Sequence, residues 1–298
     1  MFFSIIIPTY NRAHLILNTL DSIKNQEFKN YEVIIVDDGS SDNTKEVVEN
    51  YIKINNLNYW NYFYKINEER GAARNYGVEK SNGMFVTFLD SDDLFYNNHL
   101  QVAYDFFEKN NKMEVFHSAY EFKNPILKTI KKVKYLDNTL NNAILKGNIM
   151  SCFGVFLRKE IALNYPFNED RKLSGSEDWL LWLQLLPKHT IYFQNIVTGC
   201  MVEHSERSVL NFNTQELKNR ADLLFYKLSN NQDFVAKFGI KITKSIYAHM
   251  LSYGALHLML SGKRKESLSM LISAVKMNYS ELFKKRTLGI LKNIFKSK

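Results

Sequence analysis

The strongest constraint on the fold is an alternation, over the first ninety residues, of short apolar runs with segments of helical periodicity. The apolar runs predict four strands: 2–7, 32–36, 61–66 and 85–89. The segments between them predict three helices: 15–23, 44–52 and 72–80. Strands joined through single helices by short connections form right-handed βαβ units, which build a parallel sheet. We therefore expect an α/β protein with a Rossmann-like, mostly parallel sheet flanked by helices.

The rhythm changes after residue 93. A helix at 98–109 leads to a strand at 115–122, a basic stretch at 126–135 without a clear signal, and a further strand region at 147–157. Beyond residue 211 only helical periodicities follow: 216–228, 246–259, 266–277 and 282–294. We expect an α/β domain over 1–210, with halves at about 1–110 and 111–210, and a helical region over 211–298.

Polar residues directly follow three of the predicted strands. These residues are Pro8–Arg12, the pair Asp37-Asp38, and Asp90–Asp93. Ligands of open parallel sheets bind at the carboxyl ends of the strands, so the three segments predict a single binding site. Asp, Ser and Gly are also ordinary turn formers, which is the alternative interpretation of each loop taken alone.

Two carboxylates in the spacing Asp90-Ser91-Asp92 can share one hard cation. Mg²⁺ and Mn²⁺ prefer oxygen ligands and keep positions for water and substrate phosphates. A cation bridging a diphosphate neutralises the charge that develops on a leaving phosphate. Asp93 is expected to cap the helix that follows it.

Composition and motifs exclude several classes of protein. An aromatic content of 14% argues against disorder, and two cysteines, Cys152 and Cys200, fit a reducing compartment. The segment Pro8–Arg12 contains no glycine, which excludes the Gly-x-Gly-x-x-Gly loop of a nicotinamide dehydrogenase. No Gly-x-x-x-x-Gly-Lys-Ser/Thr sequence is present, which excludes a P-loop nucleotidase.

The net charge of +8 is concentrated near the C-terminus. Residues 284–298 carry six basic side chains and no acidic one, with Leu288, Leu291, Ile294 and Phe295 at helical spacing. Such a basic amphipathic helix suits an anionic membrane surface, although a solvated terminus explains the same composition. Neither a secretory signal nor a membrane span is predicted, so we expect a cytoplasmic protein, peripheral on the cytosolic face of the inner membrane.

Five motifs in order carry a resemblance to a known family. They are Ser4–Arg12, Val36–Asp42, Gly71–Asn75, Asp90–Asp93 and Glu177-Asp178-Trp179. The set resembles the family 2 glycosyltransferases, which are inverting enzymes with the GT-A fold. The resemblance covers about residues 3–207.

The resemblance implies roles for individual residues. It assigns donor binding to Thr9, Tyr10, Asp38, Arg70, Arg74, Asp90 and Arg207. It assigns a Mn²⁺ or Mg²⁺ ion to Asp92, with help from Asp90 and His204. From residue chemistry alone, Arg74 is equally an ion-pair partner for an aspartate of the site. In the same way, His204 is equally a solvated loop residue.

Asp178 is the catalytic base by the same resemblance, with Glu177 and Trp179 binding the acceptor. Glu177 and Asp178 also lie at the expected start of an amphipathic helix, where Ser176 is a plausible N-cap. Acidic residues there favour the helix dipole without any chemistry. The two interpretations are compatible, because a helix start gives a base a rigid mount.

The implied reaction is a single in-line displacement. It moves a sugar from a nucleoside-diphosphate sugar, with a UDP-linked donor favoured, to a hydroxyl of a glycan or lipid-linked acceptor. Bacterial surface polysaccharide or glycoconjugate synthesis is the implied setting. The alternative is a non-catalytic protein that binds sugar nucleotides or scaffolds a membrane-associated glycan assembly complex. Nucleic-acid binding is not expected, since no recognised module is present.

Overall fold

The computed structural model describes residues 1–135, 137–204 and 213–294. The chain divides into two compact units, and each is assembled from segments that are distant in sequence. Unit 1 comprises Met1–Asn141, Ile149–Glu169 and Lys188–Ser205, and unit 2 comprises Asn142–Asn148, Asp170–Pro187 and Glu206–Lys298. The sheet belongs to unit 1, and the long C-terminal helices belong to unit 2.

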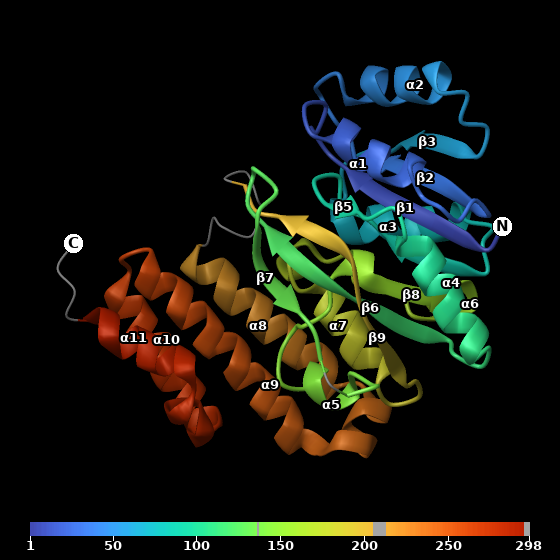
Figure 1. The fold of residues 1–298 in the computed structure, drawn as a ribbon. Helices are drawn as coiled ribbons and strands as arrows, with labels where there is room; N and C mark the ends of the chain where they lie inside the picture. Colours follow the sequence, from blue (N-terminus) through green and yellow to red (C-terminus); the bar gives the residue numbers. More distant parts are fainter. Residues whose placement is uncertain (136, 205–212, 295–298) are drawn as a thin grey trace. The chain divides into compact units, whose positions relative to one another are not determined.

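The first four strands form the parallel part of the sheet (Figure 1). Strand β1 (Phe3–Thr9) lies between β2 (Tyr31–Asp37) and β4 (Phe85–Phe88), and β3 (Trp60–Tyr64) pairs with β2. All residues of β1, β2 and β4 are buried, as expected for strands covered on both faces. The α/β fold class is confirmed.

The second half of the sheet is mixed rather than parallel. Within the described residues one nine-stranded sheet has the order β3-β2-β1-β4-β8-β6-β9-β5, with β7 pairing β6. The added strands are β8 (Val155–Arg158), β6 (Val115–Lys123), β9 (Ile191–Val202), β5 (Leu94–Phe95) and β7 (Thr129–Val133). Only β6 and β9 run parallel among them. Strand β7 falls in the basic stretch that had no clear sequence signal.

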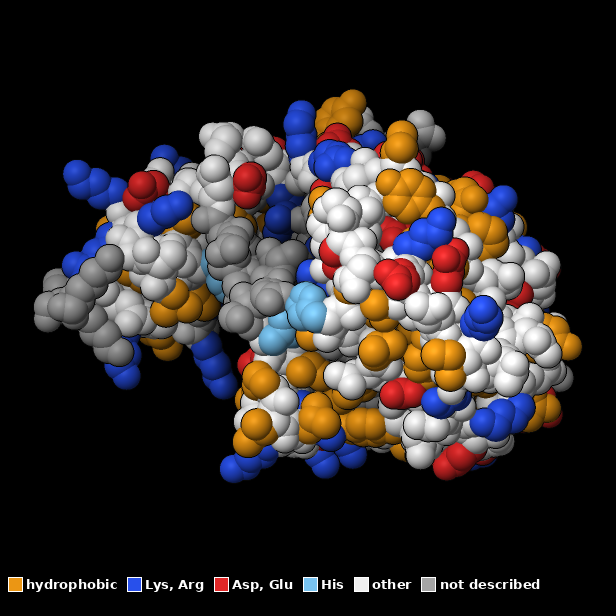
Figure 2. All heavy atoms as spheres, turned by 90° about the horizontal axis from the view of Figure 1, so that it is seen from above, with side chains coloured by type: hydrophobic (Ala, Val, Ile, Leu, Met, Phe, Trp, Pro, Cys, Tyr) orange, Lys and Arg blue, Asp and Glu red, His pale blue; other side chains and the backbone are white. Residues whose placement is uncertain are grey.

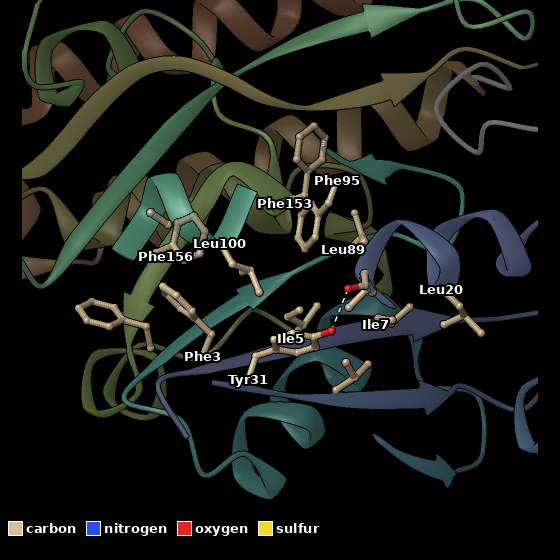
Figure 3. Packing of buried hydrophobic residues seen from close by; sticks show 14 of the residues in the cluster. Phe3, Ile5, Ile7, Leu20, Tyr31, Leu89, Phe95, Leu100, Phe153 and Phe156 are labelled. Carbon is tan, nitrogen blue, oxygen red and sulfur yellow. Dashed lines mark hydrogen bonds between the residues drawn. The ribbon is translucent and has the colours of Figure 1, made fainter. Parts of the chain in front are cut away.

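Helices cover both faces of the parallel strands. Alternate residues of β1, such as Ile5 and Ile7, join a core with Leu20 of α1 (Ile16–Lys24). Helices α2 (Thr44–Ile54) and α4 (His99–Lys109) add Val48 and Leu100 to the same core, and Figure 3 shows Leu100 in it. The residue between, Ile6, meets α3 (Glu69–Lys80) on the opposite face. A Cβ at Gly77 would lie 2.4 Å from Ile6 Cγ2, so α3 approaches β1 closely because this residue is glycine.

Unit 2 is helical. Its described elements are part of α5 (Asn141–Ile144), α7 (Glu177–Leu185), α8 (Thr214–Ser229), α9 (Gln232–Leu260), α10 (Arg264–Met277) and α11 (Lys285–Ile294), with short 3₁₀ turns Arg171–Leu173 and Tyr279–Phe283. Helix α9 changes direction at Gly239, whose φ of 77° lies in the left-handed region. Helices α8 to α11 share one apolar core that includes Leu217, Leu258, Leu271 and Ile290. No helix of the described residues is long and apolar enough to cross a membrane.

The predicted elements of the first half are all present, with shifted ends. The third strand ends at Tyr64 instead of Ile66, and the third helix begins at Glu69 instead of Ala72. The four C-terminal helices are also found, although α9 begins well before the predicted residue 246. Helix α6 (Lys159–Asn164) and the 3₁₀ turn Cys152–Gly154 complete unit 1.

Helix α1 offers a matched test of the core. Leu20 is fully buried in it, whereas Leu17 on the same helix is 42% exposed. We expect Leu20→Ala to lower the free energy of unfolding by about 2–5 kcal/mol, because it leaves a cavity. Leu17→Ala should cost less than about 1 kcal/mol. Chemical denaturation of both variants measures the difference, and equal losses would contradict this packing.

Candidate active site

The loops that follow β1 and β2 are joined by hydrogen bonds at one edge of the sheet. Asn11, with φ 51°, donates its backbone N–H to Ser40 Oγ at 2.8 Å. Its side-chain Oδ1 accepts the backbone N–H of Ser41 at 2.8 Å. The backbone N–H of Arg12 donates to Thr44 Oγ1 at 3.0 Å. The polar segments after β1 and β2 therefore form one structure, and a shared ligand site that also includes Asp90–Asp93 stays a prediction.

Thr9 and Asp38 lie together at this edge. The backbone N–H of Asp38 donates to the carbonyl of Thr9 at 2.8 Å, and both side chains are buried. Among the described residues, no hydrogen-bond partner is found for the buried Oγ1 of Thr9. A buried hydroxyl is normally satisfied, so an unpartnered one beside a carboxylate suits a ligand with both donor and acceptor groups.

Lys65 and the residues after it hold Asp38 in place. Asp38 Oδ1 accepts Lys65 Nζ at 3.0 Å and the backbone N–H of Glu68 at 3.0 Å, while Asn67 Nδ2 donates to the Asp38 carbonyl at 2.8 Å. Burial alone would lower the pKa of Lys65, but its hydrogen bonds to Glu68 and Asp38 outweigh burial and raise it. The Asp38 charge is thus compensated on one oxygen. Among the described residues, the other oxygen of Asp38, Oδ2, accepts no hydrogen bond.

Sequence reasoning missed Lys65 and Asn67. The predicted third strand ran to Ile66, which hid Lys65 inside it and placed Asn67 directly after it, whereas β3 ends at Tyr64. Lys65 is the first residue after the strand, in the same position as Asp38 after β2. Gly39, with φ 84°, turns the chain toward this segment, and a Cβ there would lie 2.9 Å from the Asn67 nitrogen.

Arg74 forms an ion pair with Asp90. Its NH2 lies 2.7 Å from Asp90 Oδ1, and its guanidinium lies 5.2 Å from the ring centroid of Phe167. Arg74 is 1% exposed and Asp90 29% exposed. This contact was the alternative interpretation of Arg74 in the sequence. It orients Asp90, which is the donor-binding carboxylate of the resemblance.

Gly71, at the start of α3, allows another backbone segment of the protein to pack closely against the helix. A Cβ at Gly71 would lie 2.7 Å from the carbonyl oxygen of Asn168. Asn75 fastens the same segment, since its Nδ2 donates to the Phe167 carbonyl at 2.9 Å and its Oδ1 accepts the Phe167 N–H at 2.8 Å. Residues 167–168 therefore lie directly against the start of α3.

Asp92 and His204 lie side by side, with His204 Nε2 3.1 Å from Asp92 Oδ2. The pairing of β5 with β9 explains this. Leu94 is opposite Cys200, and the backbone N–H of Val202 donates to Asp93 Oδ1 at 3.2 Å. The residues just before β5 and just after β9 are therefore neighbours. The prediction that Asp93 caps a helix is wrong, because α4 begins later and its N-cap is Asn98.

The residues present fit a divalent cation. An imidazole nitrogen and a carboxylate oxygen are both ligands that Mn²⁺ accepts. No group of three or more His, Cys, Asp or Glu side chains suited to a metal is found in the described parts of the chain. The protein would then supply two ligands, Asp92 and His204, and the diphosphate and water the others, a common arrangement for Mg²⁺ and Mn²⁺.

The remaining donor-site predictions differ in what the structure says of them. Tyr10 follows β1 and is 48% exposed, which suits a side chain that covers a ligand. Arg70 is partly buried in the first turn of α3, after Glu69, whose φ is 79°. Arg207 lies outside the described residues.

Asp178 lies in unit 2, in the first turn of α7. Its Oδ2 accepts Asn148 Nδ2 at 3.0 Å, and its Oδ1 accepts the backbone N–H of Trp179 at 2.7 Å. Ser176 occupies the N-cap position but makes no capping hydrogen bond through its side chain. Instead, the buried Glu177 accepts the backbone N–H of Gly175 at 2.6 Å. Sequence reasoning missed Asn148, for which the chain gives no signal.

Trp179 anchors the start of α7. The ring is 4% exposed, its Nε1 donates to the Ile144 carbonyl at 3.0 Å, and it meets the ring of His249 edge-on at 5.4 Å. Arg286 of α11 in turn donates to His249 Nδ1 at 2.9 Å. Trp179 and Glu177 thus have structural roles within unit 2. A contact of either residue with an acceptor stays a prediction.

His99 supports the segment that carries Asp92. It stacks on Phe95 of β5 at 3.8 Å, and its Nδ1 contacts Thr198 Oγ1 of β9 at 2.8 Å. Burial, with a smaller contribution from His117, lowers the pKa of His99 to about 3. In the unfolded chain a histidine titrates near 6.5. The contribution of the neutral His99 to the free energy of unfolding is therefore fully present above about pH 6.5, and it is lost as the pH falls from there toward 3.

We expect His99→Phe to reduce the pH dependence of the free energy of unfolding by up to about 1.4 kcal/mol per pH unit below pH 6. The reason is that phenylalanine takes up no proton when the chain unfolds. Urea denaturation between pH 7.5 and 5 measures the slope, with the exposed His14→Phe as control. Equal slopes for wild type and His99→Phe would contradict the assignment.

Comparison with known proteins identifies relatives of this chain. Residues 4–162 match the family model described as glycosyl transferase family 2. An uncharacterized glycosyltransferase of Rickettsia bellii is 31% identical over 218 residues, which are 71% of this chain and 29% of that protein. The Escherichia coli UDP-Glc:alpha-D-GlcNAc-diphosphoundecaprenol beta-1,3-glucosyltransferase WfgD is 30% identical over 228 residues, which are 74% of this chain and 84% of WfgD.

A solved structure shares the fold. The structure of S. aureus TarS 1–349 in complex with UDP superimposes with a TM-score of 0.67 at 21% sequence identity, covering 99% of this chain and 88% of that one. This likeness confirms the GT-A fold. The chain spans about a third of the length of three Rickettsia relatives, 29–31% of each.

Proposed function

This chain belongs to glycosyl transferase family 2, because the family model covers more than half of its residues. On that premise we propose that the protein transfers a sugar from a nucleoside-diphosphate sugar to an acceptor hydroxyl. The observation that carries the proposal is the arrangement at the carboxyl edge of the parallel strands. An unpartnered buried hydroxyl (Thr9), a compensated carboxylate (Asp38) and Asp92 lie at or after the ends of three neighbouring strands of one unit, β1, β2 and β4. His204, just after the end of β9, pairs with Asp92. Each suits a different part of a nucleotide sugar.

The donor we propose is UDP-linked. The imide N–H of uracil would donate to Asp38, and Thr9 Oγ1 would donate to a uracil carbonyl, which satisfies the buried hydroxyl. Tyr10 is exposed beside them and can cover the base. UDP is the ligand of the TarS structure, and WfgD is named for a UDP-sugar donor. Arg74 would act through Asp90, whose carboxylate it holds for the nucleotide side of the donor.

A Mn²⁺ or Mg²⁺ ion held by Asp92 and His204 would stabilise the negative charge of the departing diphosphate. The protein's own part is to keep both ligands in place. Pairing of β5 with β9 does this, because both ligands extend from the ends of paired strands. Asp90, two residues before Asp92, would help to hold the ion and the donor, and its carboxylate is already oriented by the ion pair with Arg74.

The base we propose is Asp178, which would accept the proton of the acceptor hydroxyl. Attack of that oxygen on the anomeric carbon, opposite the leaving diphosphate, inverts the configuration in a single displacement. Asn148 and the backbone of Trp179 each hold one oxygen of Asp178 and fix the direction of its carboxylate. The buried Trp179 keeps the start of α7 rigid.

The acceptor we propose is a lipid-linked glycan in bacterial polysaccharide or glycoconjugate synthesis. WfgD is named for a diphosphoundecaprenol-linked sugar. A place at the cytosolic face of the inner membrane follows from such an acceptor. Helix α11 supports it, because Leu288 and Leu291 are 61% and 45% exposed beside the exposed Lys285 and Lys292. Ile290 faces the core of unit 2, so only part of the helix is free for lipid.

Asp178→Asn should lower kcat by about 10²- to 10⁴-fold, because an amide cannot accept the proton. Binding of the nucleotide sugar should change little, since the donor subsites are elsewhere in the chain. Transfer to a diphospholipid-linked acceptor sugar and calorimetric donor binding measure the two effects. Asp105→Asn, an exposed aspartate of α4, is the control. Turnover near that of wild type would exclude Asp178 as the base.

Asp92→Asn should weaken Mn²⁺-dependent binding of UDP by at least about tenfold, because one of two protein ligands loses its charge. Calorimetry with UDP in the presence and absence of Mn²⁺ measures the dependence. His204→Ala should produce a loss of the same kind, and the double variant should lose less than the product of the two. An unchanged effect of Mn²⁺ in Asp92→Asn would refute the metal assignment.

The alternative is a non-catalytic member that binds sugar nucleotides or scaffolds an assembly complex. Donor hydrolysis with Mn²⁺ separates the two, since a scaffold binds the donor without consuming it. Nucleic acid is a poor candidate partner. On the face drawn in Figure 2, Lys and Arg side chains stand in separate groups among acidic and apolar ones.

A further inference from the structure

The hairpin formed by β6 and β7 carries a concentrated basic and apolar surface. Residues 123–135 contain five lysines and no acidic residue: Lys123, Lys128, Lys131, Lys132 and Lys134. Three large apolar side chains at and near its tip are exposed, Ile126 at 81%, Ile130 at 54% and Leu127 at 51%. No role in the reaction proposed above uses this segment.

The tip of the hairpin is a defined turn. The backbone N–H of Asn124 donates to the Lys128 carbonyl at 3.0 Å, and that of Leu127 donates to the Asn124 carbonyl at 2.8 Å. Asn124 Oδ1 also accepts the backbone N–H of Lys128 at 2.8 Å. Leu127 has a φ of 58°, in the left-handed region that large side chains rarely adopt. The turn therefore presents two apolar side chains to solvent in spite of a backbone cost.

Protection of a sheet edge explains only part of this surface. Lysines on an exposed strand prevent pairing with other chains, and β7 has four exposed residues of five. Edge protection has no use for exposed isoleucine and leucine, which favour association. Apolar side chains surrounded by lysines are instead the composition of segments that insert into an anionic lipid interface.

The hairpin lies at the same edge of the sheet as the metal-binding pair. Strand β6 runs parallel to β9, with Lys123 opposite Val202. The backbone N–H of Glu203 donates to the Lys123 carbonyl at 2.8 Å, so both strands end together, and Figure 1 shows the hairpin tip beside the end of β9. His204 follows immediately. A surface bound by the hairpin therefore comes close to the donor site within the same unit.

The positive charge of the chain is concentrated in the hairpin and in the C-terminal segment. Residues 123–135 and 284–298 together hold 11 of the 39 basic side chains and none of the 31 acidic ones. The rest of the chain has fewer basic than acidic side chains. The excess positive charge thus lies in two segments, one in each unit, and both carry exposed apolar side chains.

We propose that the β6–β7 hairpin is a membrane-contact surface for anionic lipid, with Ile126 and Leu127 entering the interface and the four exposed lysines, Lys128, Lys131, Lys132 and Lys134, contacting lipid headgroups. Each lysine at such a surface strengthens binding by about fivefold, the equivalent of about 1 kcal/mol. The hairpin acts separately from α11, which belongs to the other unit. Its purpose, to bring the donor site to a lipid-linked acceptor, rests on the proposed function, whereas the binding itself does not.

The test uses the full chain with the variant Ile126→Ser/Leu127→Asn. Asparagine tolerates the left-handed backbone of residue 127, and both side chains are exposed, so the variant should fold as wild type does. Partitioning is measured onto vesicles of phosphatidylglycerol mixed with phosphatidylcholine, and onto phosphatidylcholine alone. Ile54→Ser removes an isoleucine that is 78% exposed on α2 and is the matched control.

Wild type and Ile54→Ser should bind the anionic vesicles equally, and Ile126→Ser/Leu127→Asn should bind them at least about tenfold more weakly. Lys128→Ser/Lys131→Ser should lose a comparable factor in affinity for the anionic vesicles. High salt should make the difference between this variant and wild type smaller, because it screens the charges. Equal binding by wild type and the tip variant would overturn the proposal. The proposal would also be overturned if only Leu288→Ser/Leu291→Ser in α11 abolished vesicle binding. The same holds if Ile126→Ser/Leu127→Asn changed the association of the protein with itself but not its binding to vesicles.

A second measurement, donor hydrolysis in solution, distinguishes failure of the membrane-contact proposal from failure of the proposed function. The tip variant should hydrolyse UDP-sugar as wild type does, because the hairpin contains no donor-site residue. A wild type that binds anionic vesicles through the hairpin but consumes no donor would refute the transferase and leave the membrane surface standing. A wild type that consumes donor but does not bind vesicles would refute the membrane surface alone.

Discussion

The short antiparallel pairing of β5 with β9 is the constraint on which the candidate site depends. β5 has only two residues, yet it joins the segment after β4 to the last strand of the sheet. Asp92 and His204 are 112 residues apart in sequence and meet because of this pairing. Gly199 permits it, since a Cβ there would lie 3.0 Å from the Leu94 carbonyl oxygen. His99 and Phe95 stack behind it and shield it from water.

Buried charge is compensated one partner at a time around the site. Arg74 neutralises Asp90, and Lys65 neutralises one oxygen of Asp38. Such pairs contribute little to stability by themselves, because desolvation offsets their attraction, but losing one partner leaves a costly unpaired charge. Their value is orientation. Each fixes a carboxylate in one direction before any ligand arrives, which reduces the cost of ordering the site on binding.

The sequence predicted the parallel strands and the polar loops well, because buried strands and turn residues have strong local signals. Apolar runs such as 32–36 need no knowledge of their neighbours. What sequence reasoning missed depends on contacts between distant residues. Lys65 was hidden by a strand end placed two residues too late, Asn148 and Phe167 have no local signal, and Asp93 was assigned to a helix that starts six residues later. The basic stretch 126–135 was noted without a structure, because β7 is stabilised by pairing with β6 and not by burial.

The interleaving of the two units has a consequence for how the protein can be divided. Within the described residues the chain passes between the units at 141, 148, 169 and 187. No single cut therefore releases either unit with all of its segments, and the short pieces 142–148 and 170–187 of unit 2 are each held at both ends by unit 1. Asp178 and Asn148 sit in those two pieces. A chimera of two relatives joined at any point between residues 148 and 178 would take Asp178 and its hydrogen-bond partner Asn148 from different parents.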